Sequence, residues 1–455
     1  MKRIISLLII AVMFLTVSCS ENEISLIPFI NSSADGALDC EGKVFSFASS
    51  WYSEWYAFSD DELPTASVEA MMERFHSIKD EFNAEFEMLE IQMEDLPMLL
   101  ITGESLPEII DMEADVAYDL YKSNALISLN QLGSVDNNDI KWGEPNFIQY
   151  GKFEGEQYGF YPWHWEFIPQ FTGTVLFNGE LISSFGGINP YEIKENGLWN
   201  WDTFEDELKK YTVFENEIQH YGAVIDSYAK TAKAAIFSNG AQIIDGNEES
   251  GYNFGVNSTS ALEALEWLKG IDSQKLLLDK DFLSFSIEKL APFWIGESYY
   301  GTVFNPNDEH NKNFAPSALN DYGFITFPVG PEGTDSDVGS YVYASRRLNY
   351  ISQISDIEPD NIGTIIDYIF EPIDGKDVAW QDLAKDMIFT ETNNDYCLEN
   401  FIYILENMEY DYSVQMGESV LTQLEDALEN IVTGRRSIAE ALGTVESAVM
   451  AEIDK

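Results

Sequence analysis

LPEIID at residues 106–111 is the third of three short apolar runs that together decide the fold, after KVFSFA at 43–48 and FEMLEI at 86–91. Each run predicts a strand. Apolar residues at helical spacing fill positions 68–82 in the first gap, and a short helical segment that ends near Gly103 fills the second. Strands that alternate with helices in this way indicate an α/β fold with a mostly parallel sheet flanked by helices.

The same alternation returns in the rest of the chain, with clearer signals at the ends of the helices. Asp202, Ser260 and Ser437 are each followed three residues later by Glu, which is the pattern of a capping box, and each predicts the start of a helix. Gly270 predicts the end of the helix that begins at Ser260. We therefore expect the last third of the chain to be largely helical.

The N-terminus has the layout of a secretory signal. Lys2 and Arg3 precede an apolar run at residues 4–17, which is too short to span a membrane comfortably. The run ends in Thr-Val-Ser-Cys, which resembles a bacterial lipobox. Residues 1–18 are therefore expected to be a signal peptide, Cys19 the acylated first residue of the mature protein, and residues 19–37 a tether at the outer face of the bacterial cell membrane. Ordinary cleavage that leaves Cys19 unmodified is the alternative.

The composition indicates a folded chain of two lobes with a strongly acidic surface. The chain has 455 residues, of which 45% are hydrophobic and 14% aromatic, so it can bury more than one core. The 25 Lys and Arg against 79 Asp and Glu give a net charge of −54. This charge excludes nucleic acids and anionic membrane surfaces as partners, and it disfavours an anionic ligand unless a local basic pocket exists.

Three cysteines occur in the chain, and Cys19 is assigned to the lipid. Cys40 and Cys397 remain, far apart in sequence. An exported protein permits a disulfide between them, but nothing in the spacing requires one, so a pair of free buried thiols is an equal alternative.

Seven stretches, in the right order, resemble markers of extracellular solute-binding proteins of the maltose-binding-protein-like type, which serve ABC importers. They include LPEIIDMEADVAYDLYKSNALISLNQL, GKFEGEQYGFYP and NGLWNWDTFEDELKKYT, and the resemblance runs from about Cys40 to the C-terminus. The stretches are residues 106–132, 151–162, 173–192, 196–212, 235–245, 322–333 and 431–442.

This resemblance implies a periplasmic-binding-protein-like fold. Two lobes, each a helix-flanked and mostly parallel sheet, are joined by crossing strands, and the ligand cleft lies between them. It places lobe one at residues 38–165 plus 296–345, and lobe two at residues 166–295 plus 346–455. The chain departs from the family at residues 163–166, where Trp-His-Trp-Glu replaces the usual small residues before the crossover.

A sugar ligand needs flat aromatic faces for its C–H surfaces, with carboxylates and amides for its hydroxyls. The family cleft draws such side chains from loops at strand ends. Packing in the core or between the lobes is the alternative for each aromatic residue, and a solvated surface is the alternative for the two acids. The candidates are Trp51, Tyr52, Trp55, Asp111, Trp163, Trp165, Glu166, Tyr228, Trp294 and Tyr343.

Signals of catalysis are absent from the sequence. Its four histidines show no metal-binding spacing, and no H-E-x-x-H, G-x-S-x-G or P-loop motif occurs. We therefore expect no enzyme, cofactor or metal, and instead a monomer that captures an oligosaccharide and delivers it to the permease subunits of an ABC transporter. The alternatives are a surface lipoprotein with a glycoside-directed enzymatic or adhesive role, or a binding protein for a non-sugar solute such as a peptide.

Overall fold

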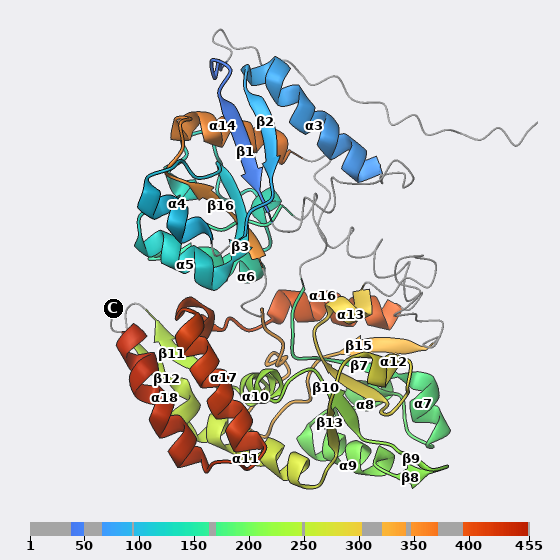
Figure 1. The fold of residues 1–455 in the computed structure, drawn as a ribbon. Helices are drawn as coiled ribbons and strands as arrows, with labels where there is room; N and C mark the ends of the chain where they lie inside the picture. Colours follow the sequence, from blue (N-terminus) through green and yellow to red (C-terminus); the bar gives the residue numbers. More distant parts are fainter. Residues whose placement is uncertain are drawn as a thin grey trace, which may run out of the picture.

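The protein folds into two lobes, each built on its own five-stranded sheet (Figure 1). The structure is a computed structural model, and it describes residues 38–49, 66–92, 95–162, 170–247, 251–302, 321–342, 347–371 and 395–453. In each sheet one strand runs against the other four, so the predicted mostly parallel, helix-flanked sheets are confirmed.

Lobe one contains the sheet with strand order β2-β1-β3-β16-β4. Phe45, Phe75 and Ile109 are among the side chains that form its core between the sheet and α3. The strands are β1 (Val44–Ala48), β2 (Glu85–Leu89), β3 (Ile109–Glu113), β4 (Leu126–Ile127) and β16 (Arg347–Ser352), and the flanking helices are α3 (Ala66–Phe82), α4 (Leu96–Thr102), α5 (Ala114–Lys122), α6 (Pro145–Ile148) and α14 (Pro359–Ile369).

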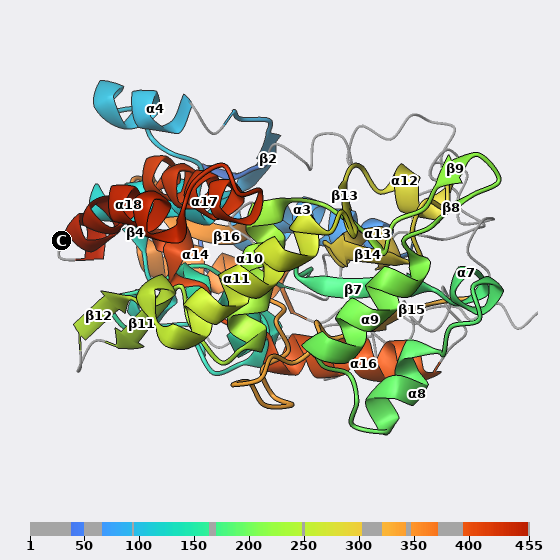
Figure 2. The ribbon, with the colours of Figure 1, turned by 90° about the horizontal axis from the view of Figure 1, so that it is seen from below.

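Lobe two contains the sheet with strand order β13-β10-β14-β7-β15. Helices α10, α11 and α17 pack on one another beside this sheet, and α18 lies along α17 (Figure 2). The strands are β7 (Thr174–Asn178), β10 (Ala223–Ile225), β13 (Leu277–Asp279), β14 (Phe293–Gly296) and β15 (Tyr322–Ile325), and the helices are α7 (Gly179–Ser184), α8 (Pro190–Glu195), α9 (Trp201–Tyr211), α10 (Tyr228–Ser238), α11 (Thr259–Ser273), α12 (Leu283–Ser286), α13 (Tyr299–Thr302), α16 (Asp395–Asn407), α17 (Glu418–Val432) and α18 (Ile438–Ile453).

Two returning segments belong to the opposite lobes from those predicted. Residues 321–342 were expected in lobe one, yet β15 pairs with β7 in lobe two. Residues 347–371 were expected in lobe two, yet β16 pairs with β3 in lobe one. The chain therefore remains in lobe two until after residue 342. The predicted boundary at 296 is wrong, and at 346 the chain does cross between the lobes but in the opposite direction from that predicted. A buried strand carries no local signal that names its sheet.

The predicted helix starts are correct at one helix and shifted at two. Ser437 Oγ accepts a hydrogen bond from the Glu440 backbone at the start of α18, as predicted. Helix α9 is capped by Asn200, and α11 by Ser258, each two residues before the expected cap. Both residues have extended backbone, which a cap requires, whereas Asp202 and Ser260 already lie within their helices. Helix α11 also continues past Gly270 to Ser273.

The remaining structural features concern cysteines, membrane helices and metals. Cys40 and Cys397 form no disulfide with each other and are buried in two different core clusters, which decides between the two alternatives for them. Among the described residues, none of the helices has both the length and the apolar character needed to cross a membrane. The same part of the chain contains no group of three or more His, Cys, Asp or Glu that could hold a metal ion.

Candidate functional site

Asp111 lies beside the point where the chain returns from lobe two to lobe one, after residue 342, and its carboxylate is already bound by protein groups. It accepts hydrogen bonds from Ser49 Oγ at 2.7 Å and from Arg347 Nε at 3.2 Å. Burial raises the pKa of Asp111, although Arg347 and Ser49 favour its charged form. Asp111 therefore connects β3 to the strand that follows the crossing, and a direct contact with ligand remains a prediction.

Lobe two has a charged cluster at the carboxyl ends of two neighbouring parallel strands. Asp226 follows β10, Glu297 follows β14, and Lys230 Nζ bridges them at 2.6 Å and 3.1 Å. The predicted residue Tyr228 lies beside this cluster and donates its hydroxyl hydrogen to Asp272 at 2.8 Å. The pKa of Tyr228 is raised mainly by burial and, to a smaller extent, by this hydrogen bond. Such strand ends are where ligands bind in α/β folds.

Trp294 differs from the prediction because it is a core residue. Its side chain is 1% exposed in β14 and packs on Phe282, with ring centroids 5.1 Å apart, and on Tyr300 at 5.6 Å. A strand in the middle of a sheet covered by helices is buried on both faces, so its alternate side chains do not reach a cleft. Trp294 is therefore not placed on a ligand-accessible surface.

The other predicted site residues lie outside the described residues. They are Trp51, Tyr52, Trp55, Trp163, Trp165, Glu166 and Tyr343, together with the predicted lipid attachment residue Cys19.

A hollow of about 520 Å³ lies between the lobes, and we call it the tyrosine pocket. Lobe one contributes α5 and the hairpin of β5 (Lys152–Phe153) and β6 (Glu156–Gln157). Lobe two contributes β12 (Gly251–Phe254), the 3₁₀ helix η8 (Tyr412–Gln415) and the end of α18. In Figure 1, α5 lies directly above β12 and α18. The lining residues are Tyr118, Tyr121, Lys122, Gln149, Lys152, Phe153, Glu154, Gly155, Tyr252, Tyr410, Tyr412, Gln415 and Ile453.

Each lobe supplies a cluster of aromatic rings to the tyrosine pocket. In lobe one, Tyr121 stacks on Phe153 with centroids 4.7 Å apart. In lobe two, Tyr412 meets Tyr410 at 4.2 Å edge to face and Tyr252 at 5.2 Å. Rings in these arrangements hold one another in position, so the pocket has prearranged aromatic walls on two sides.

Polar groups of the tyrosine pocket join the lobes and leave one hydroxyl unused. Gln415 Nε2 of lobe two donates to the backbone oxygens of Tyr150 at 3.2 Å and Lys152 at 3.0 Å in lobe one. Burial and a hydrogen bond to Glu154 raise the pKa of Tyr121. The buried hydroxyl of Tyr410 has no hydrogen-bond partner among the described residues.

Of the ten residues predicted to bind ligand, three lie in the described part of the chain, and none of these three (Asp111, Tyr228 and Trp294) lines the tyrosine pocket. The available signals are the aromatic repeats YDLY at 118–121 and YDY at 410–412. The first places two rings on one face of α5, because residues three apart are neighbours on a helix. Neither repeat lies at a strand end, which is where the resemblance predicts ligand-binding residues.

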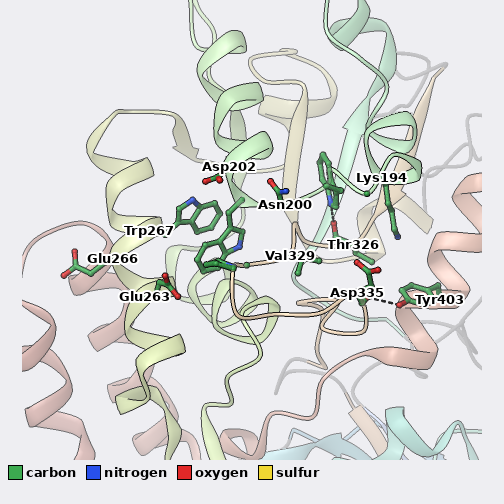
Figure 3. A pocket seen from close by; sticks show the side chains of 15 residues that line it. Lys194, Asn200, Asp202, Glu263, Glu266, Trp267, Thr326, Val329, Asp335 and Tyr403 are labelled. Carbon is green, nitrogen blue, oxygen red and sulfur yellow. Dashed lines mark hydrogen bonds between the residues drawn. The ribbon is translucent and has the colours of Figure 1, made fainter.

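A larger hollow of about 950 Å³ lies within lobe two alone (Figure 3). Trp201 and Trp267 stack on each other there at 4.3 Å, and Trp199 Nε1 donates to the Thr326 backbone at 2.8 Å. Burial lowers the pKa of Lys194 to about 8 in its wall. Among the described residues, lobe two alone lines this larger hollow, whereas both lobes line the tyrosine pocket, so we take the tyrosine pocket as the candidate site.

Sequence comparisons find no relatives, but solved structures match almost the whole chain. No model of a known protein family matches it, and no curated protein does. The GacH receptor of Streptomyces glaucescens, solved unliganded and with acarbose, is 12% identical, with a TM-score of 0.61 over 91% of this chain and 99% of its own.

Two further structures give the same result. The ABC substrate-binding protein of Listeria monocytogenes in complex with cycloalternan is 14% identical, with a TM-score of 0.60 over 91% of this chain and 100% of its own. The sugar-binding protein MalE of Xanthomonas citri is 13% identical, with a TM-score of 0.62 over 90% and 98%. At this level of identity the likeness establishes the fold. The chain therefore has the two-lobed α/β fold of the MalE-like substrate-binding proteins of ABC transporters.

Proposed function

We propose that this protein is an extracellular solute-binding protein that captures an oligosaccharide between its lobes and delivers it to the permease subunits of an ABC transporter. The observation that carries this proposal is the tyrosine pocket, because aromatic rings from both lobes line one hollow of about 520 Å³. Tyrosine rings offer flat apolar faces to the C–H surfaces of sugar rings, while the amide of Gln149 and the side-chain oxygen of Gln415 are suited to hydroxyls.

A ligand that contacts both lobes also has a physical way to change the conformation of the protein. It binds the closed arrangement more strongly than an open one and so favours closure of the lobes. The three solved structures named above support a sugar, since their names include acarbose, cycloalternan and a sugar-binding protein. We propose further that the protein acts as a monomer, attached through an acylated Cys19 to the outer face of the cell membrane.

The sequence-predicted residues beside the first crossing are proposed as a second part of the site. Trp163, Trp165 and Glu166 directly follow Pro162, whose ring fixes the backbone just before the chain passes into lobe two. Their place in the sequence, at the passage from lobe one to lobe two, supports the proposal that these aromatic side chains stack on the ligand close to both lobes.

Calorimetric titration with oligosaccharides tests the proposal. Tyr121→Ala and Tyr412→Ala should each weaken binding by about 2 kcal/mol, the magnitude typical of a buried aromatic hot spot. Phe214→Ala is the matched control, because this ring is 71% exposed on the β8 (Phe214–Glu215) and β9 (Ile218–Gln219) hairpin of lobe two. Unchanged affinity in both tyrosine variants, with thermal unfolding like that of the unmodified protein, would place the ligand elsewhere.

A further inference from the structure

The tyrosine pocket differs in charge from the rest of the molecule. The chain has a net charge of −54, yet among the described residues the ionisable side chains that line this pocket, other than tyrosines, are Lys122, Lys152 and Glu154. The hollow within lobe two shows the opposite balance, with Asp202, Glu263, Glu266 and Asp335 against Lys194. The tyrosine pocket is therefore a locally basic place on an acidic protein, which is the condition under which an anionic ligand becomes favourable.

The two lysines of the tyrosine pocket lack carboxylate partners. Most lysines in the described ranges lie within 4 Å of a carboxylate oxygen, as expected in so acidic a chain; they are Lys79, Lys141, Lys209, Lys210, Lys230, Lys233, Lys269 and Lys275. Within the same part of the chain, Lys122 and Lys152 form no such pair. Lys122 Nζ lies 5.1 Å from the ring centre of Tyr118. The side chains of Lys122 and Lys152 are both exposed, so both ammonium groups are accessible to a ligand.

Among the described residues, Glu154 is the acidic side chain that lines the pocket, and its carboxylate forms no ion pair with Lys122 or Lys152. It instead helps to raise the pKa of Tyr121, beside which it lies. Among the described residues, the charged groups of the hollow are therefore two ammonium groups and one carboxylate, which is a net positive balance. An ammonium group donates and never accepts, so it suits a carboxylate, which only accepts, better than a neutral sugar hydroxyl, which does both.

We infer that the tyrosine pocket takes a uronic-acid oligosaccharide, with its sugar rings on the tyrosines and its carboxylates on Lys122 and Lys152. This inference rests on the proposed function and narrows it from sugars in general to acidic sugars. The rings supply affinity that is independent of charge, and the two lysines supply the preference for the acid over its neutral counterpart.

The experiment compares uronic-acid trisaccharides with their own methyl esters, which keep the sugar and remove the charge. Trisaccharides of galacturonate, glucuronate and mannuronate are titrated calorimetrically into the full chain, each as acid and as ester, at low and at high NaCl. At least one acid should bind about tenfold more tightly than its ester at low salt, since two exposed ion pairs contribute about threefold each. High salt should reduce this preference.

Variants then assign the preference to the two lysines. Lys122→Gln and Lys152→Gln should each reduce binding of the acid about threefold and leave binding of the ester unchanged. Lys280→Gln and Lys289→Gln are matched controls, because these lysines also form no ion pair among the described residues but lie outside the pocket. They should change nothing.

The outcomes separate this inference from the proposed function. Esters or neutral oligosaccharides that bind as tightly as the acids, or a preference for acids that survives in the Lys122→Gln, Lys152→Gln double variant, overturn the inference and leave sugar capture intact. A folded protein that binds neither the acids, the esters nor neutral oligosaccharides overturns both.

Discussion

Removal of Lys233 is the perturbation whose cost can be worked out most directly from the structure. This lysine lies on α10 with 1% of its side chain exposed, and its Nζ is 3.0 Å from Asp411 Oδ2 and 3.3 Å from Glu425 Oε1. Burial by itself lowers the pKa of Lys233, but the two carboxylates raise it above its ordinary value, so the lysine stays charged. Asp411 lies between Tyr410 and Tyr412, and the ion pair therefore holds the tyrosine wall of the pocket against lobe two.

The expected cost follows from what Lys233→Met leaves behind. The attraction to Asp411 at 3.0 Å is about 5.5 kcal/mol at an effective dielectric constant of about 20, and part of it offsets the burial of the ammonium group. In the variant, Asp411 is a carboxylate with 0% exposure and no cation, whereas Glu425 is 23% exposed and can turn to water. We expect the free energy of unfolding to fall by about 3–5 kcal/mol.

Urea denaturation followed by tryptophan fluorescence measures this cost, and a second variant tests the reason for it. Lys233→Met combined with Asp411→Asn should recover part of the loss, because the amide carries no charge and its oxygen can still accept from the Ser413 backbone. Lys209→Met is the control, since this lysine is 45% exposed in its pair with Glu205 and should cost less than about 1 kcal/mol. The reasoning fails if Lys233→Met costs no more than this control, or if the double variant is no more stable than the single one.

Three further predictions concern other parts of the chain. Because burial lowers the pKa of Lys194 to about 8, its charge destabilises the folded state below that pH, and the penalty is relieved as pH rises from 8 to 10.5. The Lys194→Met variant should therefore be more stable than the unmodified protein by up to about 3 kcal/mol at pH 7. Urea denaturation should show a smaller difference in stability at pH 10. A difference that is the same at both pH values contradicts the lowered pKa of Lys194. Trp163→Ala should weaken sugar binding by about 2 kcal/mol in calorimetry with little loss of stability, whereas a core tryptophan would cost about 3–5 kcal/mol of folding free energy instead. Cys19→Ala should release the protein into the medium or leave it uncleaved, and mass spectrometry that finds Cys19 unacylated in the unmodified protein refutes the anchor.

Local elements of the fold are predictable because their signals lie between neighbours in the sequence. The strand at residues 43–48, the helix at 68–82 and the helix that begins after Ser437 all lie where the spacing of apolar residues and the capping serine predict them. The two-lobed architecture was also predictable, since ordered markers along the whole chain resemble one family, and the solved structures share that fold.

The tyrosine pocket was not predicted from the sequence, since Asp111, Tyr228 and Trp294 do not line it. Asp111 and Tyr228 lie near a crossing segment or just after a strand, and their contact with ligand stays a prediction. Trp294 illustrates the limit of prediction from sequence. A tryptophan near a strand end can either stack on a sugar or pack in the core, and only the contacts with Phe282 and Tyr300 show that Trp294 is buried. Burial depends on what lies on both faces of a strand, which no local pattern states.

The sequence by itself determined the fold class and several local helices and strands, because the spacing of apolar side chains sets which face of each element must be buried. The two lobes were expected from the length of the chain and from the resemblance to one family. Only the tertiary structure decided which lobe receives β15 and β16, and that Tyr121 and Tyr412 line one pocket. The pairing of a short buried strand, and the meeting of two helical segments from distant parts of the chain, depend on how complete cores pack against each other. That packing joins residues whose separation in sequence carries no signal of their contact.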